Sequence, residues 1–243
     1  MLDEMMTGLK DNCYWDEHRY NYYVRLRELL LNPPDGFKVH ATRATVMNDT
    51  SPESLTYEKA ECIFASNMLA RLKPDSILDV GSYRTFLMGL TAHYKITSLD
   101  VRPTEEKSKL DNETLVISDA KDLKIESDSF DAVLSLCSLE HFGLGRYGDE
   151  FDLDADKKAM DEMKRVLKPG GHLIFTTTIT QAHPVIYFNA HRIYNYKMLS
   201  DFCNGLTMVD EAFYRFIVND MCKKEEIENR DGEFSVYCGC WQK

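Results

Sequence analysis

The feature that most constrains the fold is an alternation of short apolar segments and helix-forming segments through the middle of the chain. Apolar runs that predict strands lie near residues 76–80, 95–100, 114–118, 131–136 and 172–178. Segments with helical spacing of their apolar residues lie near 84–92, 154–167 and 195–204. Two later apolar runs, near 206–216 and 233–241, have the pattern of a terminal antiparallel hairpin. Such alternation is typical of a mainly parallel sheet covered by helices on both faces. The predicted fold is therefore α/β, a doubly wound sheet of seven strands.

The first predicted strand runs directly into a glycine turn. Ile77–Val80 precedes Gly81, a helical stretch follows, and the second strand ends in Asp100, 21 residues after Asp79. A strand, a glycine turn, a helix and a second strand that ends in an acid form the nucleoside-binding half of a Rossmann-like sheet. The glycine lets the backbone approach a ligand, and the acid can accept both ribose hydroxyls. The loop holds one glycine where such loops usually hold two or three.

The organisation of the chain and its charge limit the partners. We expect a helical extension or cap over residues 1–50 and a single domain over 51–243. The 40 acidic and 29 basic residues give a net charge of -11, which disfavours a nucleic-acid partner. No apolar run approaches the length of a membrane span, no signal-peptide core is present, and the seven cysteines show no disulfide spacing. We therefore expect a cytoplasmic protein without membrane contact; the sequence does not indicate an oligomeric state.

Further motifs follow the later predicted strands in order. Asp119 and Ala120 end the third strand, SFDAVLS at 129–135 contains the fourth, and RVLKPGG at 165–171 leads into the fifth. Together with LDVG at 78–81, Asp100 and LEH at 139–141, these motifs resemble those of class I S-adenosylmethionine-dependent methyltransferases. The resemblance covers about residues 75 to 180.

That resemblance implies a cofactor, S-adenosyl-L-methionine, with S-adenosyl-L-homocysteine as its product. Its glycine loop would pass the methionine moiety, and its acids would hold the ribose and the adenine. Carried over by position, the cofactor-binding residues are Asp79, Gly81 and Ser82 in the loop, Tyr83 beside it, Asp100 at the ribose, Asp119 and Ala120 at the adenine, and Leu136 and Cys137 near the methionine end. The chain departs from the family at Tyr83 and Thr85, where glycines are usual. Tyr83 either covers the cofactor or fills its pocket.

A narrower resemblance concerns two later segments. LEHFGLGRYGDEFD at 139–152 and FNAHR at 188–192 are similar to a group of methyltransferase-like proteins known as a domain of unknown function. Some relatives lie among surface-polysaccharide genes. This resemblance implies O-methylation of a small polar acceptor, such as a sugar, a sugar nucleotide or a surface-polysaccharide precursor.

Methyl transfer to a hydroxyl benefits from a base at the carboxyl ends of the fourth and fifth strands. His141 is the first choice, because its ordinary pKa lies near neutrality. Glu140 precedes it and Asp149 lies in the following loop, so these three residues are the predicted catalytic set. The alternative is that Glu140 and His141 cap or orient the next helix. The predicted substrate-binding residues are Arg146, His183, Asn189, His191 and Arg192. Either arginine is equally consistent with a surface ion pair.

Glu140 and His141 also resemble part of a metal site. Some ubiquinone-pathway and small-RNA 2′-O-methyltransferases carry Glu-x-x-Glu-His there and bind a divalent ion. Here the first position is Cys137, a soft thiol that argues against magnesium, although His183 or His191 could supply another ligand. A divalent metal is therefore disfavoured. The alternative functions are a catalytically inactive methyltransferase-like binding protein, a nicotinamide-dependent oxidoreductase, and a metal-dependent RNA 2′-O-methyltransferase.

Overall fold

The computed structural model describes residues 24, 27–33, 55–102, 110–188 and 190–243. Residues Ser54–Lys243 form one compact unit. Most of the predicted extension over residues 1–50 lies outside the described residues, and the domain boundary at residue 51 stays a prediction. Within that extension, Val24 and residues 27–31 are helical, and the helix ends before Asn32 and Pro33.

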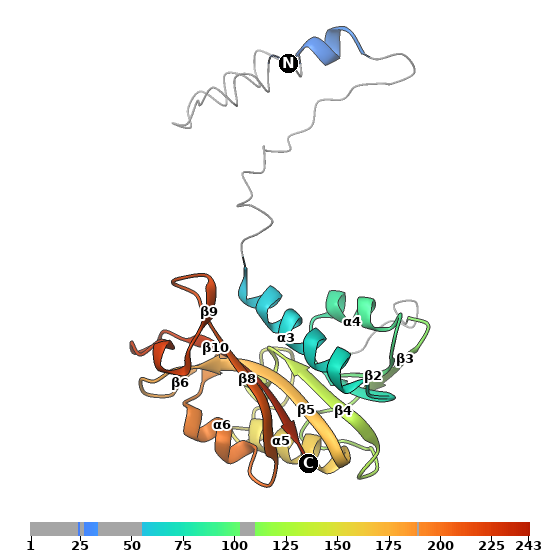
Figure 1. Ribbon diagram of the computed structural model, residues 1–243, viewed down its shortest axis with the longest axis vertical. Helices are drawn as coiled ribbons and strands as arrows, with labels where there is room; N and C mark the ends of the chain where they lie inside the picture. Colours follow the sequence, from blue (N-terminus) through green and yellow to red (C-terminus); the bar gives the residue numbers. More distant parts are fainter. Residues whose placement is uncertain (1–23, 25–26, 34–54, 103–109, 189) are drawn as a thin grey trace. The chain divides into compact units, whose positions relative to one another are not determined.

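The main sheet has eight strands, not the seven that the sequence predicts (Figure 1). Five are parallel, in the order β3 (Glu113–Ile117), β2 (Lys95–Asp100), β1 (Ser76–Val80), β4 (Phe130–Leu136) and β5 (Leu167–Ile179). The antiparallel strands β10 (Ser235–Gln242), β8 (Thr207–Arg215) and β9 (Asp220–Cys222) follow them. The additional strand is β9, a three-residue edge strand that is too short to show a periodic pattern.

The two predicted terminal runs pair antiparallel, as β8 with β10. Their connection is longer than a hairpin turn, because β9 and the 3-10 helix η3 (Lys224–Glu226) lie within it. Strands β6 (Val185–Tyr187) and β7 (His191–Ile193) form a separate antiparallel pair that the sequence analysis does not include. The FNAHR motif spans the turn between them.

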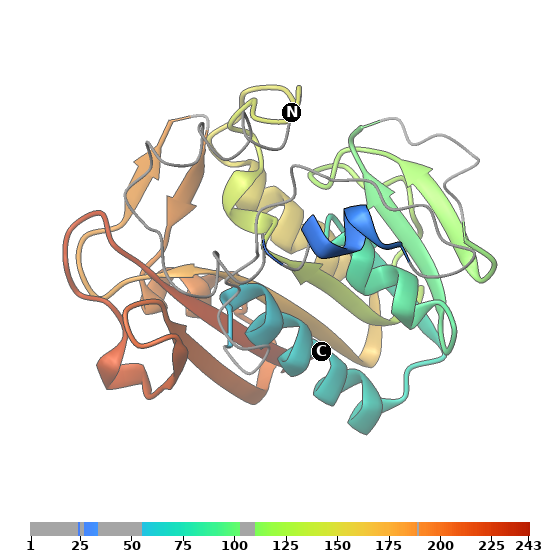
Figure 2. The same cartoon turned by 90° about the horizontal axis from the view of Figure 1, so that it is seen from above.

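Helices cover both faces of the sheet, which gives the protein two hydrophobic cores (Figures 1 and 2). On one face lie α3 (Tyr57–Leu72) and α4 (Arg84–Leu90), which pack on one set of alternating strand residues such as Ile77, Ile96 and Leu134. On the other face lie α5 (Ala155–Val166) and α6 (Tyr196–Phe202), which pack on the alternate set, such as Leu78, Val133 and Leu173. Because successive strand side chains point to opposite faces, the near-continuous apolar strands fill both cores. Among the described residues, no helix is both long and apolar enough to cross a bilayer.

The strand order reverses direction between β1 and β4. The chain builds outward from β1 through β2 to β3, and then returns to add β4 and β5 on the other side of β1. Such a switch point opens a crevice at the carboxyl ends of the strands, where sheets of this kind bind ligands. Gly81 sits there with φ of 76°, and a Cβ at this position would lie 3.1 Å from the Cβ of Ser138. Both observations explain why glycine follows β1.

Candidate functional site

Two cavities with shared walls lie at the switch point. The first, about 90 Å³, is lined by Asp100, Asp119, Ala120 and His141 among others, and we call it the Asp119 cavity. The second, about 650 Å³, is lined by residues that include the predicted cofactor loop, and we call it the Asp79 cavity. The shared lining residues are Gly81, Leu99, Asp100, Arg102, Cys137 and Tyr147. The structure therefore gathers all nine predicted cofactor residues around this pair of cavities.

The predicted ribose acid, Asp100, is held by a neighbouring arginine. Arg102 donates from Nε to Oδ1 at 2.9 Å and from a terminal nitrogen to Oδ2 at 2.6 Å, and its guanidinium lies 4.8 Å from the Tyr147 ring centre. Partial burial tends to raise the pKa of Asp100, but the hydrogen bonds from Arg102 outweigh it and lower the pKa below its usual value. The carboxylate is ionised and able to accept hydroxyl donors, yet Arg102 occupies both of its oxygens.

Asp79 offers an unpartnered acceptor inside the Asp79 cavity. Its Oδ2 accepts a hydrogen bond from the Ser82 backbone at 3.3 Å, while its Oδ1 is buried and has no partner among the described residues. Burial raises the pKa of this carboxyl from 3.8 to about 7. Ser82 in turn accepts from the Leu136 backbone at 2.9 Å, which ties the loop to β4. A buried oxygen that lacks a donor is suited to an ammonium group such as that of methionine.

Tyr83 turns toward α3. Its hydroxyl donates to Oε2 of Glu61 at 2.6 Å, and its ring packs with the core beneath α3. Glu61 is 1% exposed, and its other oxygen accepts from the Thr176 hydroxyl at 2.7 Å. Burial outweighs these two hydrogen bonds and raises the pKa of Glu61 to about 7. Glu61 is not among the site residues predicted from the sequence. Its one indication there is an acid beside Ala60, within the buried stripe of a helix.

A third cavity of about 260 Å³ lies beside the first two, and we call it the Glu140 cavity. Its acidic and aromatic walls come from several elements, and its lining residues include Glu61, Cys137, Glu140, His141, Arg146, His191 and Phe234. Cys137 lines all three cavities, and His141 lines both this one and the Asp119 cavity. The third cavity therefore meets the first two at Cys137 and His141.

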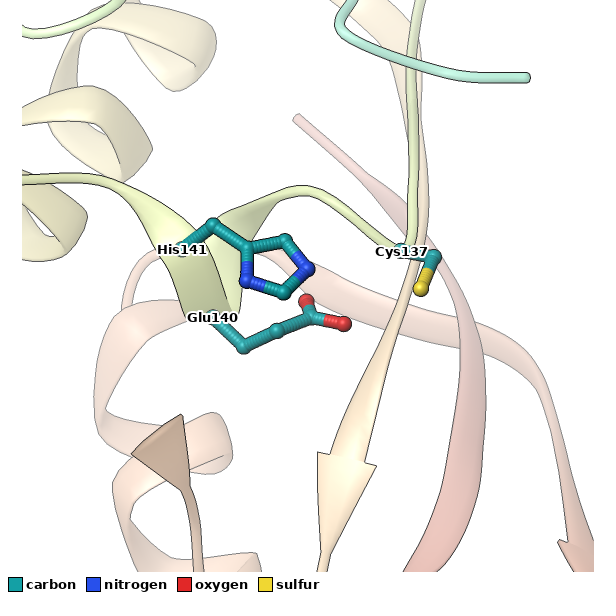
Figure 3. Close-up of side chains that lie close together, drawn as sticks. All are labelled: Cys137, Glu140 and His141. Atoms are coloured by element: carbon teal, nitrogen blue, oxygen red, sulfur yellow. The ribbon is translucent and has the colours of Figure 1, made fainter. Parts of the chain in front are cut away.

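Cys137, Glu140 and His141 point toward a common space at the end of β4 (Figure 3). Their ligand-type atoms all lie within 4.8 Å of one another. The short 3-10 helix η2 (Leu139–His141) carries two of them, and Cys137 precedes it with φ of 50°, in the left-handed region that non-glycine residues seldom adopt. Glu140 is 1% exposed and accepts from the Thr177 hydroxyl at 2.9 Å.

The ring of His141 has a defined tautomer. Its Nδ1 lies 2.5 Å from the carbonyl oxygen of Ala190. A carbonyl only accepts hydrogen bonds, so Nδ1 carries a proton, and in the neutral imidazole Nε2 carries the lone pair. This contact joins the LEHFGLGRYGDEFD and FNAHR motifs. Arg146 donates to the same carbonyl at 3.2 Å.

Two predicted substrate residues lie at the Glu140 cavity and two do not. Arg146 and His191 line it, and the Nε2 of His191 is buried without a partner among the described residues.

Arg192 is 5% exposed and donates to the carbonyls of Phe142 and Leu153 at 2.6 and 3.2 Å, so it supports the loop and is not placed to bind a substrate. His183 is exposed and lines none of the three cavities. Asn189 lies outside the described residues.

Asp149 has a structural role that the sequence analysis did not predict. Its two oxygens accept from the backbones of Gly145 and Tyr147 at 3.3 and 3.1 Å, which fixes the loop after η2. It lines the Asp119 cavity and not the Glu140 cavity. Both oxygens of Asp149 are therefore engaged by the backbone of this loop.

The fold is that of S-adenosylmethionine-dependent methyltransferases. The chain is similar to 1,6-didemethyltoxoflavin-N1-methyltransferase of Burkholderia thailandensis, solved with S-adenosylhomocysteine, at 15% identity over 77% of this chain and 79% of that one, with a TM-score of 0.57. It is also similar to the N-methyltransferase NodS of Bradyrhizobium japonicum WM9 in complex with S-adenosyl-l-homocysteine, at 16% identity over 77% and 88%, with a TM-score of 0.54. The [4+2]-cyclase SpnF matches at 16% identity over 80% and 84%, with a TM-score of 0.57, so the fold alone does not fix the reaction.

The chain belongs to the family described as Caenorhabditis protein of unknown function, DUF268, whose model matches residues 92–220. The matched region contains both motifs of the narrower resemblance. No curated protein matches the chain.

Proposed function

We propose that this protein is an S-adenosylmethionine-dependent methyltransferase. The observation that carries the proposal is the meeting of two kinds of cavity at Cys137 and His141. On one side lie the cavities with a glycine turn, a ribose-type acid and an adenine-type acid. On the other lies the Glu140 cavity, whose walls are acidic and aromatic and contain none of these three features. A methyl donor in the first pair and an acceptor in the third would meet at the shared wall.

The residues of the chain fit such a cofactor. Asp100 offers an ionised carboxylate to ribose hydroxyls, Asp119 lines the cavity where an adenine amino group would lie, and the buried Oδ1 of Asp79 lacks a donor among the described residues. When bound, S-adenosylmethionine supplies an electrophilic methyl carbon whose bond to sulfur breaks as the acceptor's lone pair forms the new bond. Gly81 allows the backbone to approach that group closely.

We further propose O-methylation of a small polar acceptor, of the class of a sugar, sugar nucleotide or surface-polysaccharide precursor. The Glu140 cavity, about 260 Å³, supports this size, and its charged and imidazole side chains, Glu140, Arg146 and His191, would meet polar groups of the acceptor. In the neutral imidazole, Nε2 of His141 is the basic atom that would take the proton of an acceptor hydroxyl, and the buried Glu140 would help to hold the acceptor. The six described cysteines are free, which supports a reducing compartment such as the cytoplasm.

Titration calorimetry tests the cofactor assignment. We expect S-adenosylmethionine and S-adenosylhomocysteine to bind the full chain, and Asp100→Ala to weaken both by at least about tenfold, since two charged hydrogen bonds are lost. Asp75→Ala, an exposed acid ahead of β1, is the control and should bind as the parent does.

Two results would contradict the proposal. An absence of heat with both compounds at sub-millimolar concentration, in a folded protein, would favour the inactive binding protein. Tight NADH binding would favour the nicotinamide-dependent oxidoreductase. A chelator-sensitive activity with a salt-sensitive RNA complex would support the RNA 2′-O-methyltransferase in place of a small acceptor.

A further inference from the structure

We propose that Cys137 Sγ, the Glu140 carboxylate and His141 Nε2 bind one divalent metal ion in the Glu140 cavity, with zinc as the best fit. The catalytic part of this inference rests on the proposed function. The binding of the ion does not, and it can be measured in a protein without any substrate.

The geometry of the three groups is close to that of a metal site. Their ligand-type atoms lie within 4.8 Å of one another and point into one space (Figure 3). Zinc–ligand bonds of about 2.0 to 2.3 Å imply ligand separations of roughly 3.3 to 3.8 Å in a tetrahedral site. The three side chains therefore need to approach by about 1 Å, which rotation of the Glu140 and Cys137 side chains can supply.

The surroundings of His141 are those of an oriented ligand. Its Nδ1–H donates to the carbonyl oxygen of Ala190, so the Nε2 lone pair faces the space shared with Cys137 and Glu140. Metal-bound histidines almost always donate their other ring N–H to a carbonyl or carboxylate, because this fixes the tautomer and the ring orientation.

Glu140 has no cationic partner among the described residues. Within the part of the chain that the structure describes, its buried carboxylate accepts from the Thr177 hydroxyl and forms no ion pair. Glu61, a second carboxylate at 1% exposure, lines the same cavity. Two buried carboxylates without a cation are costly, and a bound cation would offset that cost.

An independent observation comes from His191. Its Nε2 is buried, has no partner among the described residues, and belongs to a ring that lines the same cavity. The ring centres of His141 and His191 are 6.4 Å apart. His191 is therefore placed as a fourth ligand, or as a group that holds a ligand bound to the ion.

The donor set decides which ion fits. Sulfur, nitrogen and a single carboxylate match zinc, whereas magnesium and calcium prefer oxygen ligands alone. An ammonium group could also offset the two carboxylates, but it would not explain a thiol beside two ring nitrogens. With the ion bound, the Nε2 lone pair of His141 is a ligand. The ion, rather than a free histidine, would then lower the pKa of an acceptor hydroxyl.

Metal analysis of the full chain tests the proposal. We expect protein from zinc-supplemented cultures to hold one zinc per chain by elemental analysis, and chelated protein to bind Zn²⁺ but not Mg²⁺ in calorimetry. Cobalt should give a sulfur-to-cobalt charge-transfer band, which reports on thiolate ligation directly. Cys137→Gly should weaken zinc by more than about 100-fold, since changes of even the outer partners of a ligand cost 10–100-fold.

The variants separate metal loss from misfolding. Glycine adopts the positive φ of residue 137 without strain, so Cys137→Gly preserves the turn. Cys62→Ser, a half-buried cysteine on α3 that lines none of the cavities, is the matched control and should keep the metal. Zinc affinity unchanged in both Cys137→Gly and His141→Ala would overturn the proposal, as would an ammonium compound that binds where zinc does not.

Failure here and failure of the proposed function give different results. S-adenosylhomocysteine calorimetry on the same chelated sample reports the cofactor cavities alone. Retained binding with no zinc site would leave the methyltransferase proposal standing, with His141 as a free base. Zinc binding without S-adenosylhomocysteine binding would support the zinc site and contradict the methyltransferase proposal.

Discussion

Arg102 is the residue that most directly opposes a ligand at the switch point. It donates to both oxygens of Asp100 and also lies against Tyr147, so the ribose hydroxyls must compete with it for this carboxylate. Its side chain is 57% exposed. An ion pair that exposed contributes at most about 1 kcal/mol, so the barrier it sets to binding is small.

Arg102→Ala should therefore bind S-adenosylhomocysteine about two- to fivefold more tightly, because a 1 kcal/mol ion pair corresponds to that range. Calorimetry measures the change. Lys124→Ala is the matched control, since Lys124 pairs with the acid two residues before it, Asp122, on an exposed segment outside the three cavities. Weaker binding in Arg102→Ala would mean that the arginine contacts the cofactor instead of competing with it.

Individual residues were predictable from sequence where a local motif defined them. Gly81 follows β1, Asp100 ends β2 and Asp119 lies two residues after β3, so their positions at strand ends could be predicted from the sequence. Glu61 was not predictable, because its partner Thr176 is 115 residues away in the chain. The contacts of Arg192 were not predictable either, because a basic residue in a loop motif gives no sign that it will donate to backbone carbonyls.

The loop between η2 and α5 is the element that positions His141 and Tyr147. Gly143 has φ of 70°, its carbonyl accepts from the Asp152 backbone at 2.9 Å, and a Cβ there would lie 2.0 Å from the Asp152 carbonyl oxygen. Gly148, in the same loop, has φ of 82° but no atom within 4 Å of such a Cβ. Substitutions at these two glycines therefore distinguish the effect of steric crowding from the effect of the left-handed backbone conformation.

Gly143→Ala should lose about 3–5 kcal/mol of unfolding free energy, from left-handed strain together with overpacking. Gly148→Ala should lose only about 1–2 kcal/mol, from strain alone. Urea unfolding followed by circular dichroism compares them. Equal losses in the two variants would show that the contact between Gly143 and Asp152 does not organise the loop.

The predicted strands agree with the structure where the apolar pattern is long, and strands are missed where it is short. The strands predicted near 76–80 and 95–100 have those bounds, because apolar runs and flanking turns coincide. β5 begins at Leu167, earlier than the predicted 172, because Leu167 pairs with Phe130 across an irregularity in the ladder. β9 and the β6–β7 pair are three-residue strands, which periodicity cannot reveal.

At the scale of the whole molecule, the sequence predicted a doubly wound sheet because alternation is a local signal that implies a global arrangement. It could not predict that the Glu140 cavity would combine α3, β5 and the β6–β7 pair, since those contacts depend on packing. The same packing buries carboxylates such as Asp79. The free energy of unfolding of the domain therefore depends on pH through these buried carboxyls, whose burial the sequence alone does not reveal.

Stability should fall as pH rises from about 4 to about 7. The pKa of Asp79 is raised from 3.8 to about 7 by burial, so the folded state binds the proton more tightly than the unfolded state across that window. Its contribution is fully present below pH 4 and is lost as pH rises through 7. Glu228 acts oppositely: hydrogen bonds from Arg230 lower its pKa to about 2, so its contribution is lost as pH falls below its usual 4.5.

The Asp79→Asn variant isolates the contribution of Asp79 to the pH dependence of stability, because Glu61 and the other acids are unchanged in it. We expect the variant to gain about 2–3 kcal/mol over the parent at pH 7 relative to pH 5, since each pKa unit corresponds to about 1.4 kcal/mol. Thermal and urea unfolding at the two pH values measure this, with Asp75→Asn, an exposed acid, as the control. The same variant should bind S-adenosylmethionine more weakly, because its neutral amide cannot form an ion pair with an ammonium group. A gain that is equal at both pH values would assign the effect to packing and not to the titration of Asp79.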